Sequence, residues 1–302
     1  MKIFPLLGVI LSLAPARPCL AGIGAEPFDF IFLDAGARPA ALGGAYTSLA
    51  MDANALLYNP AGLARVNSHE TTFMHNSYLQ GIIQEYAAYA SPRGWSVNFN
   101  YLSFGDVQKT TLSDPDGSGL GETTLTDLAF GAGYGRALTE TLSVGVGAKY
   151  IRETIDNVTA KGFALDAGGL YRILALDGLT LGLVLQNLGP TVRFETKRED
   201  LPLNLRAGAA YCFKAYGHEH LLALDVNKER SQNALAAVGG ETRSLEPLAL
   251  RFGFNTRNDA GIGITAGFGY QFKAGSIDYA FVPMGDIGNA HRISITFHWG
   301  SM

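Results

Sequence analysis

Apolar residues alternate with small or polar residues along most of the chain, and the period of this alternation is two. In the segment 142–150, leucine, valine, alanine and tyrosine occupy the even positions, while Gly145, Gly147 and Lys149 occupy odd ones. A period of two places successive side chains on opposite faces of a β-strand, whereas a helix repeats after 3.6 residues. The pattern therefore predicts strands with one apolar face and one small or polar face.

Segments of this kind follow one another from residue 70 to residue 299, separated by clusters of Gly, Asn, Asp and Pro. The candidates are 70–78, 82–91, 94–104, 123–136, 141–154, 160–174, 178–188, 201–213, 218–228, 233–243, 246–256, 260–272, 275–283 and 290–299. Soluble strands usually end after about five or six residues, whereas a strand needs about nine to eleven to cross a membrane at a tilt. The lengths therefore favour a transmembrane barrel over a soluble β-protein. The second and tenth candidates alternate poorly, which leaves the count of about fourteen open by two.

The connections between these segments differ in length. Thr139–Glu140 and Lys273–Ala274 have the form of tight turns, whereas 105–122 and 189–200 are long loops. In outer-membrane barrels, short turns lie on the periplasmic side and long loops on the outside. Aromatic residues gather toward the segment ends, as girdles at two membrane interfaces require, and these are Trp95, Tyr134, Tyr150, Tyr171, Tyr211, Tyr270 and Trp299. We therefore predict an all-β, antiparallel transmembrane barrel over residues 68–302, located in a bacterial outer membrane.

Residues 1–21 have the form of a secretory signal peptide. Lys2 precedes an apolar run over residues 3–13, and Ala21 suits cleavage. Lipidation at Cys19 is the alternative, but arginine and proline stand before it where a lipoprotein signal has small or apolar residues. The only other cysteine is Cys212, which we expect to be a small buried hydrophobe. No later stretch contains the roughly eighteen consecutive apolar residues that a membrane helix needs. If the chain spans a membrane, strands must therefore cross it.

Residues 22–67 differ in composition from the segments that follow. The stretch 36–64 is rich in Ala and Gly, and Pro39 suits the opening of a short helix, Asp52 the cap of a second turn, and 60–62 a stop. A fourteen-stranded barrel has a lumen that its wall side chains are too small to fill. We therefore expect a short helical hatch that plugs the lumen, with glycines on the inner face leaving room for its backbone. A flexible periplasmic leader is the alternative.

Two separated stretches of the mature chain resemble a known family. The first ends in the run 59–63, with the sequence Asn-Pro-Ala-Gly-Leu, and the second covers 278–294. Both look like signatures of the PorV/PorQ family, which is similar to the FadL-type transporters of hydrophobic compounds. The residues that carry the first signature, and that form the candidate site, are Gly36, Arg38, Pro39, Gly43, Gly44, Ala45, Asp52, Asn59, Pro60, Ala61, Gly62 and Leu63.

This resemblance implies a fourteen-stranded FadL-like barrel with an N-terminal hatch. In members that serve the type IX secretion system, the barrel receives exported cargo and helps to deliver it to the cell surface. The resemblance thus implies a non-enzymatic barrel that assists protein export or surface delivery. Its partners would be outer-membrane lipid and exported cargo proteins or secretion-system components. One alternative is a FadL-like transporter, whose hatch moves to let a hydrophobic small molecule cross, and another is a permanently plugged structural barrel.

The sequence offers no candidate for catalysis. It contains no Gly-x-Ser-x-Gly elbow, phosphate-binding loop or metalloprotease helix motif. His218 and His220 share a strand face but lack a third ligand, so we expect neither a metal nor another cofactor. The formal net charge is −4 and basic residues do not alternate with aromatic ones, which argues against nucleic acid as a partner.

The predicted inner face carries charges of both signs. They belong to Asp127, Lys149, Asp166, Arg172, Arg206, Asp225, Arg251, Asp278 and Arg292. Such charges are costly on the lipid side of a barrel, but inside the lumen they pair with one another or with a plug. We expect them to be structural and to hold the hatch, with a transport-selective lining as the alternative.

Overall fold

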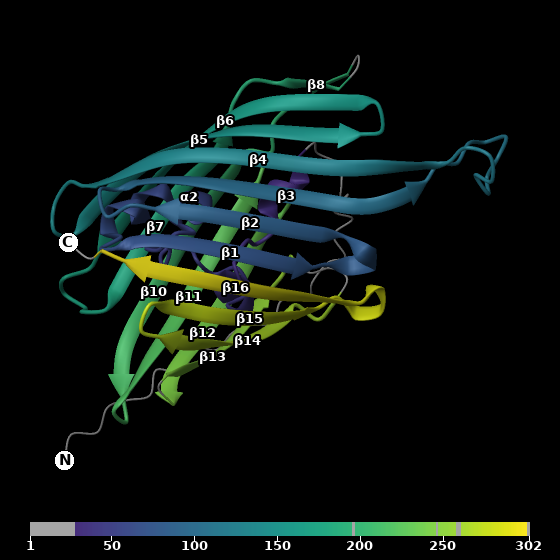
Figure 1. The fold of residues 1–302 in the computed structure, drawn as a ribbon. Helices are drawn as coiled ribbons and strands as arrows, with labels where there is room; N and C mark the ends of the chain where they lie inside the picture. The colour runs from purple at the N-terminus through teal and green to yellow at the C-terminus, as the bar shows by residue number, and fades with distance from the viewer. Residues whose placement is uncertain (1–27, 195–196, 246, 258–260, 301–302) are drawn as a thin grey trace.

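Figure 1 shows the computed structural model, which describes residues 28–194, 197–245, 247–257 and 261–300. Within these residues, fourteen strands form a closed antiparallel barrel. The barrel strands are β1 (His69–Ser77), β2 (Ile83–Ala90), β3 (Trp95–Gln108), β4 (Glu122–Ala137), β5 (Leu142–Ile155), β6 (Val158–Arg172), β7 (Leu179–Leu188), β10 (Asn204–Ala215), β11 (His218–Glu229), β12 (Ala234–Leu245), β13 (Leu248–Asn255), β14 (Ile264–Phe272), β15 (Gly275–Pro283) and β16 (Asn289–Trp299). The predicted fold class and strand count are confirmed.

Short elements complete the described chain. A separate two-stranded sheet pairs β8 (Val192–Phe194) with β9 (Lys197–Glu199). The 3-10 helices η3 (Leu79–Gly81) and η4 (Gly285–Ile287) lie in the connections β1–β2 and β15–β16. Among the described residues, no helix combines the length and the apolar character that crossing a membrane demands.

Each barrel strand pairs with its neighbour in the chain, except that β7 pairs with β10 across the β8–β9 insertion. β1 pairs with β16 to close the barrel, and closure removes the free edges that an open sheet would present. Each of the fourteen predicted segments overlaps one barrel strand, including the two weakest, 82–91 and 233–243, although several bounds differ by three or four residues. Alternation did not indicate β8 and β9, which lie in the predicted loop 189–200, because three-residue strands are too short to show a period.

The two faces of the strands are those predicted from the alternation. On β5, Val144 and Val146 are exposed, Val146 to 60%, whereas Gly145, Gly147 and Lys149 are buried. Every barrel strand carries at least one exposed large apolar side chain, so an apolar belt surrounds the barrel. A protein in water rarely exposes so large a continuous apolar surface, and a bilayer is the surrounding that matches it.

Short and long connections lie at opposite ends of the barrel. The turns Thr139–Glu140 and Lys273–Ala274 lie at the end where β16 finishes. At the other end, β3 and β4 continue past the rest of the wall, and their connection projects well beyond it (Figure 1). A register shift between Ser103 and Asp106 marks the start of this projection. Following the rule for outer-membrane barrels, we assign the short-turn end to the periplasm.

One expectation about a single residue was wrong. Cys212 was expected to be buried, but it is exposed. Its position on β10 belongs to the inner face, which alternation predicts, yet it lies close to the turn Tyr216–Gly217 at the periplasmic end. Alternation along a strand indicates the face of a side chain, but it does not indicate how deeply the lumen covers that face.

Candidate functional site

The segment before β1 lies inside the barrel and touches opposite walls. It contains η1 (Asp29–Phe32), α1 (Ala37–Ala41), α2 (Ala55–Tyr58) and η2 (Pro60–Arg65). Helix α1 contacts β13 to β16, whereas η2 contacts β4 to β6, which lie across the barrel from them. Most side chains from residue 35 to residue 63 are buried. The segment therefore fills the lumen as a hatch, as the sequence predicted. The predicted signal peptide, and the hatch residues before Phe28, lie outside the described residues.

The local structure of the hatch differs in detail from the prediction. Pro39 lies within α1 but is not its first residue, because the helix begins at Ala37 after Gly36, whose φ of 97° suits glycine. The Asp52 carboxylate accepts a hydrogen bond from the Asn54 N–H at 2.9 Å, just before α2. Helix α2 ends at Tyr58, just before the stop predicted at 60–62, but Pro60 then opens the 3-10 helix η2. Proline is well suited to a first helical position, since it has no N–H to leave unpaired.

Asn59 explains why the Asn-Pro-Ala sequence is useful at this point of the hatch. Its side-chain oxygen accepts from the Ala61 N–H at 3.1 Å and so caps η2. Its amide nitrogen donates to the carbonyl of Thr47 in the hatch and to that of Gly169 in the wall, both at 3.1 Å. One buried amide thus joins two parts of the hatch to β6. Ala61 and Leu63 are fully buried beside it.

Glycines at the hatch and on the inner wall permit close backbone contact. A Cβ atom on Gly62 would overlap the Ala50 carbonyl, and one on Gly145 of β5 would overlap the carbonyl of Pro60. Gly43, whose φ is 67°, packs against the backbone of Phe254 on β13. Gly44 lies beside the Asp34 carboxylate, and the neighbouring Ala45 is completely buried. These positions require small residues for steric reasons.

We expect Gly145→Ala to destabilise the folded barrel by about 1–3 kcal/mol, because the new methyl group must displace the backbone of Pro60. Gly147→Ala is the matched control on the same face of β5. The nearest atom to its Cβ would be the end of the flexible Leu56 side chain, at 3.0 Å, which can rotate away. Unfolding by guanidinium in lipid vesicles measures both free energies of unfolding. Equal effects of the two variants would contradict the tight contact.

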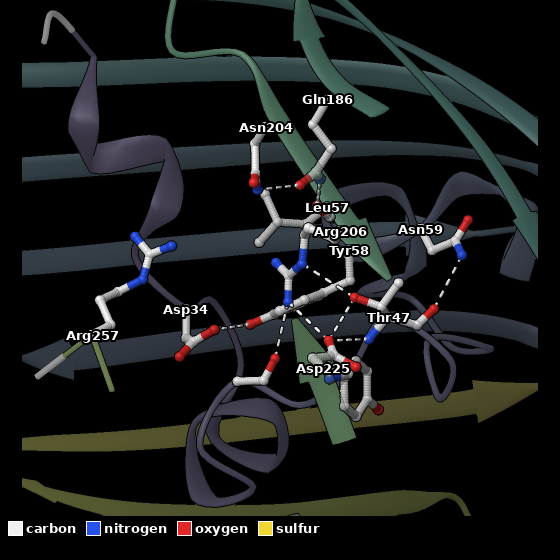
Figure 2. A network of polar contacts seen from close by, with 12 residues as sticks. Asp34, Thr47, Leu57, Tyr58, Asn59, Gln186, Asn204, Arg206, Asp225 and Arg257 are labelled. Atoms are coloured by element: carbon white, nitrogen blue, oxygen red, sulfur yellow. Dashed lines mark hydrogen bonds and ion pairs between the residues drawn. The ribbon is translucent and has the colours of Figure 1, made fainter. Parts of the chain in front are cut away.

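The most extensive anchor of the hatch joins Asp225 of β11 to Arg206 of β10 (Figure 2). The Asp225 carboxylate accepts hydrogen bonds from the backbone N–H groups of Tyr46 and Thr47, at 3.1 and 2.9 Å. Arg206 forms an ion pair with Asp225 at 3.2 Å and donates to the Gly44 carbonyl at 2.9 Å. Both side chains are almost completely buried. The ion pair on the wall thus provides hydrogen-bond partners for backbone groups of the hatch that would otherwise be unpaired.

Further contacts hold the hatch around Tyr58 (Figure 2). The Tyr58 hydroxyl donates to the Asp34 carboxylate at 2.9 Å, and burial raises the pKa of this phenol well above its usual value. The guanidinium of Arg206 lies 5.3 Å from the centre of the Tyr58 ring. On the wall, the Gln186 amide donates to the Leu57 carbonyl at 2.8 Å. The hatch is therefore fixed by its side chains as well as by its backbone.

A second anchor connects the hatch with the neighbouring part of the wall, from β12 to β15. Arg38 of α1 donates to Glu241 of β12 at 2.9 Å, and Glu241 also accepts from Arg251 of β13 at 2.7 Å. Arg251 in turn pairs with Asp278 of β15 at 2.6 Å. Four alternating charges thus extend from the hatch over the wall from β12 to β15, and each has an oppositely charged neighbour.

The hatch also carries a half-buried acid, Asp52, close to this second anchor. The Tyr46 hydroxyl donates to the Asp52 carboxylate at 2.5 Å, and Arg38 donates to the same hydroxyl at 3.2 Å. Glu70 of β1 accepts from the Ala53 N–H at 3.0 Å. Burial, and then the charge of Glu70, raise the pKa of Asp52 above its usual range.

The predicted inner charges have different partners. Arg206, Asp225, Arg251 and Asp278 belong to the two anchors, whereas Lys149 and Asp166 pair with each other at 2.8 Å. Of the remaining three, Asp127 is buried and Arg172 is exposed near the periplasmic turn. The guanidinium of Arg292 lies 6.0 Å from the centre of the Tyr78 ring.

The sequence did not single out Glu70 and Glu241. Their position on the inner face of β1 and β12 was the available signal, but β12 alternates poorly.

One apolar cluster lies near the extracellular end of the lumen. Toward the extracellular end, Phe28, Phe30 and Ile31 of the hatch form an apolar cluster with wall and loop residues. These are Leu102, Ala129, Ile151, Ala160, Ala164, Val192 and Leu201. The Phe28 N–H donates to the Glu153 carboxylate of β5 at 2.8 Å. We call this group the upper apolar cluster.

The periplasmic half contains a polar cavity of about 120 Å³ between the hatch and β12 to β16. Arg38, Asp52, Arg243, Arg251 and Asp278 line it with several hydroxyl and amide groups. A cavity of this kind suits water or a small polar molecule better than a hydrocarbon.

Among the described residues, no three His, Cys, Asp or Glu side chains meet at one point where they could hold a metal ion. His220 stacks on Phe213 with 5.4 Å between ring centres, and its Nε2 lies 3.3 Å from the Ala215 carbonyl. Its neighbour on the same strand face is His218.

Comparison with solved structures identifies the architecture. The toluene transporter TodX of Pseudomonas putida superposes with a TM-score of 0.57 at 14% identity, covering 87% of this chain and 96% of TodX. The toluene transporter TbuX of Ralstonia pickettii gives 0.57 at 14% identity, covering 88% and 98%. A FadL homologue of Pseudomonas aeruginosa gives 0.54 at 13% identity, covering 86% and 98%.

The fold is that of a FadL-like outer-membrane barrel. The profile of a family described as "Uncharacterised protein family (UPF0164)" matches residues 21–150, which include the hatch and the first strands of this FadL-like barrel. A search of curated proteins finds no match to the sequence. These comparisons support the FadL-like part of the resemblance seen in the sequence, and they do not show its finer part, PorV/PorQ.

Proposed function

We propose that this FadL-like barrel transports hydrophobic small molecules across the outer membrane and is not an enzyme. The observation that carries the proposal is the upper apolar cluster. It places apolar wall residues below the extracellular loops and in contact with a short segment of the hatch. Similar barrels are named as transporters of toluene, and an aromatic hydrocarbon has the chemistry that such a cluster would accommodate.

In the described conformation, Phe28, Phe30 and Ile31 occupy this apolar space. A hydrocarbon would therefore have to replace these side chains, so transport requires movement of the segment around η1. The anchors at Asp225 and Glu241 hold later parts of the hatch, which allows the first residues to move while α1 and η2 stay in place. The proposal thus assigns the moving part to residues 28–33.

Uptake of radiolabelled toluene by cells of a host without such a transporter tests this function. We expect cells that express the chain to take up toluene faster than cells with an empty vector. Ile31→Asp should remove the increase, because it places a charge in the upper apolar cluster. Leu112→Asp is the control, since Leu112 is fully exposed in the β3–β4 connection. Uptake equal to the empty vector, from folded barrels, would contradict the proposal.

Protein export or surface delivery is the second candidate function. The β3–β4 connection projects beyond the wall (Figure 1), and Leu112 within it is fully exposed. This favours delivery of a protein, because an exposed apolar side chain suits contact with another protein. Purification from the native membrane in mild detergent, followed by mass spectrometry, separates the two functions. Stoichiometric exported proteins would support delivery of cargo, whereas a bound hydrophobe without protein would support transport.

A further inference from the structure

Two basic side chains lie opposite each other on the outer face of β5 and β6. Arg152 and Lys161 are paired in the antiparallel register, and both are exposed. Two residues nearer the middle of the membrane on each strand, Tyr150 and Phe163 form a ring pair with 5.2 Å between centres. Because side chains two residues apart share a face, the basic pair points in the same outward direction as these rings.

The basic pair lies where the apolar belt ends. Between Leu142 at the periplasmic start of β5 and Arg152, the outward residues carry no charge. With a rise of about 3.3 Å per residue and a tilt of about 45°, this stretch spans roughly 23 Å along the membrane normal. The apolar band of such barrels is about 25 Å tall, so Arg152 and Lys161 lie at the level of the extracellular headgroups.

Neither basic side chain is balanced by the described part of the protein. Like charges directly opposite each other repel, and the residue opposite Arg152 on its other side is Leu128. Lys161 lacks a strand partner on its other side, because pairing of β6 with β7 begins only at Leu165 and Leu188. By contrast, His75 and Glu85, on the outer face of β1 and β2, form their own contact at 2.6 Å.

We propose that Arg152 and Lys161 form a binding site for the phosphate of a lipid headgroup in the extracellular leaflet. The guanidinium of arginine presents paired N–H donors to phosphate oxygens, and the lysine ammonium adds a point charge. Both long side chains can extend along the apolar surface to reach the headgroup level. The ring pair Tyr150–Phe163 lies directly below and packs against the lipid chains. The lipid thus supplies the negative charge that the protein lacks at this place.

Native mass spectrometry of the detergent-solubilised barrel tests the site with phosphatidylglycerol as the anionic probe and phosphatidylcholine as the zwitterionic one. We expect the wild type to retain phosphatidylglycerol preferentially. Arg152→Gln should weaken this binding about fivefold, and the double variant with Lys161→Gln about 25-fold, since each charge near a membrane surface contributes on this scale. Arg93→Gln, in an exposed periplasmic turn, is the charge-matched control and should leave the binding unchanged.

A second variant separates lipid binding from a purely structural role. Arg152→Glu creates a cross-strand ion pair with Lys161, so the barrel should remain at least as stable while it loses its preference for phosphatidylglycerol. Added inorganic phosphate at millimolar concentration should not displace the lipid. Unchanged retention of phosphatidylglycerol in the folded Arg152→Glu or double variant would overturn the proposal. Displacement by inorganic phosphate would do the same, because it would indicate a site for free anions.

Discussion

Replacing Asp225 with alanine is expected to lower the free energy of unfolding by about 3–5 kcal/mol, the usual cost of leaving a buried charge without its partner. In the wild type, Asp225 is 1% exposed and pairs with Arg206 while accepting two backbone hydrogen bonds from the hatch. The variant leaves Arg206, also buried, with hydrogen bonds to Gly44 and Thr47 but without a carboxylate. The same substitution removes the acceptor for the Tyr46 and Thr47 N–H groups.

Guanidinium unfolding in lipid vesicles measures this loss, and limited trypsin digestion measures release of the hatch. Asp225→Asn should be less damaging, because an amide oxygen still accepts the hatch N–H groups although the charge is lost. Asp177→Ala, an exposed residue in the turn between β6 and β7, is the control for removing a carboxylate. A loss below about 1 kcal/mol for Asp225→Ala would mean that the hatch does not depend on this anchor.

The strands could be predicted from the sequence because a barrel wall repeats one local pattern. In β5, alternation between Val146 and its neighbour Gly147 indicates both the strand and the direction of each side chain. The membrane requires an apolar outer face at every strand, so this signal recurs along the wall, although it is weak in the segments 82–91 and 233–243. The β8–β9 sheet follows no such requirement and is too short to show a period.

The hatch could be located from its composition, but its contacts could not be predicted. Arg38 and its partner Glu241 are separated by 203 residues, and Tyr46 and Asp225 by 179. Closure of the barrel brings these residues together, and no local pattern indicates which wall strand faces which part of the hatch. The sequence therefore placed Asp225 among the inner charges that hold the hatch, but it did not single out Glu241 and did not indicate which groups of the hatch each acid binds.

The function was harder to predict from the sequence than the fold, because the residues that bear on it meet only in the folded barrel. The resemblance around Asn59 and Pro60 indicated the hatch, and the structure explains this run by capping and close packing. Those roles serve the plug itself and are compatible with transport or with delivery of cargo. Evidence that favours transport comes from the upper apolar cluster, whose members range from Phe28 to Leu201 and meet only in the folded barrel.

Ion conductance in planar bilayers after deletion of residues 36–64 shows whether the hatch closes the lumen. Heat-modifiable migration on gels confirms that each inserted protein is folded. As a size control, replacing the exposed loop tip 111–119 by a short glycine linker should leave the conductance at the wild-type level. We predict that the deletion raises the conductance clearly above that of the wild type, because the inner face then surrounds a water-filled channel. Unchanged conductance through the folded deletion variant would contradict the account.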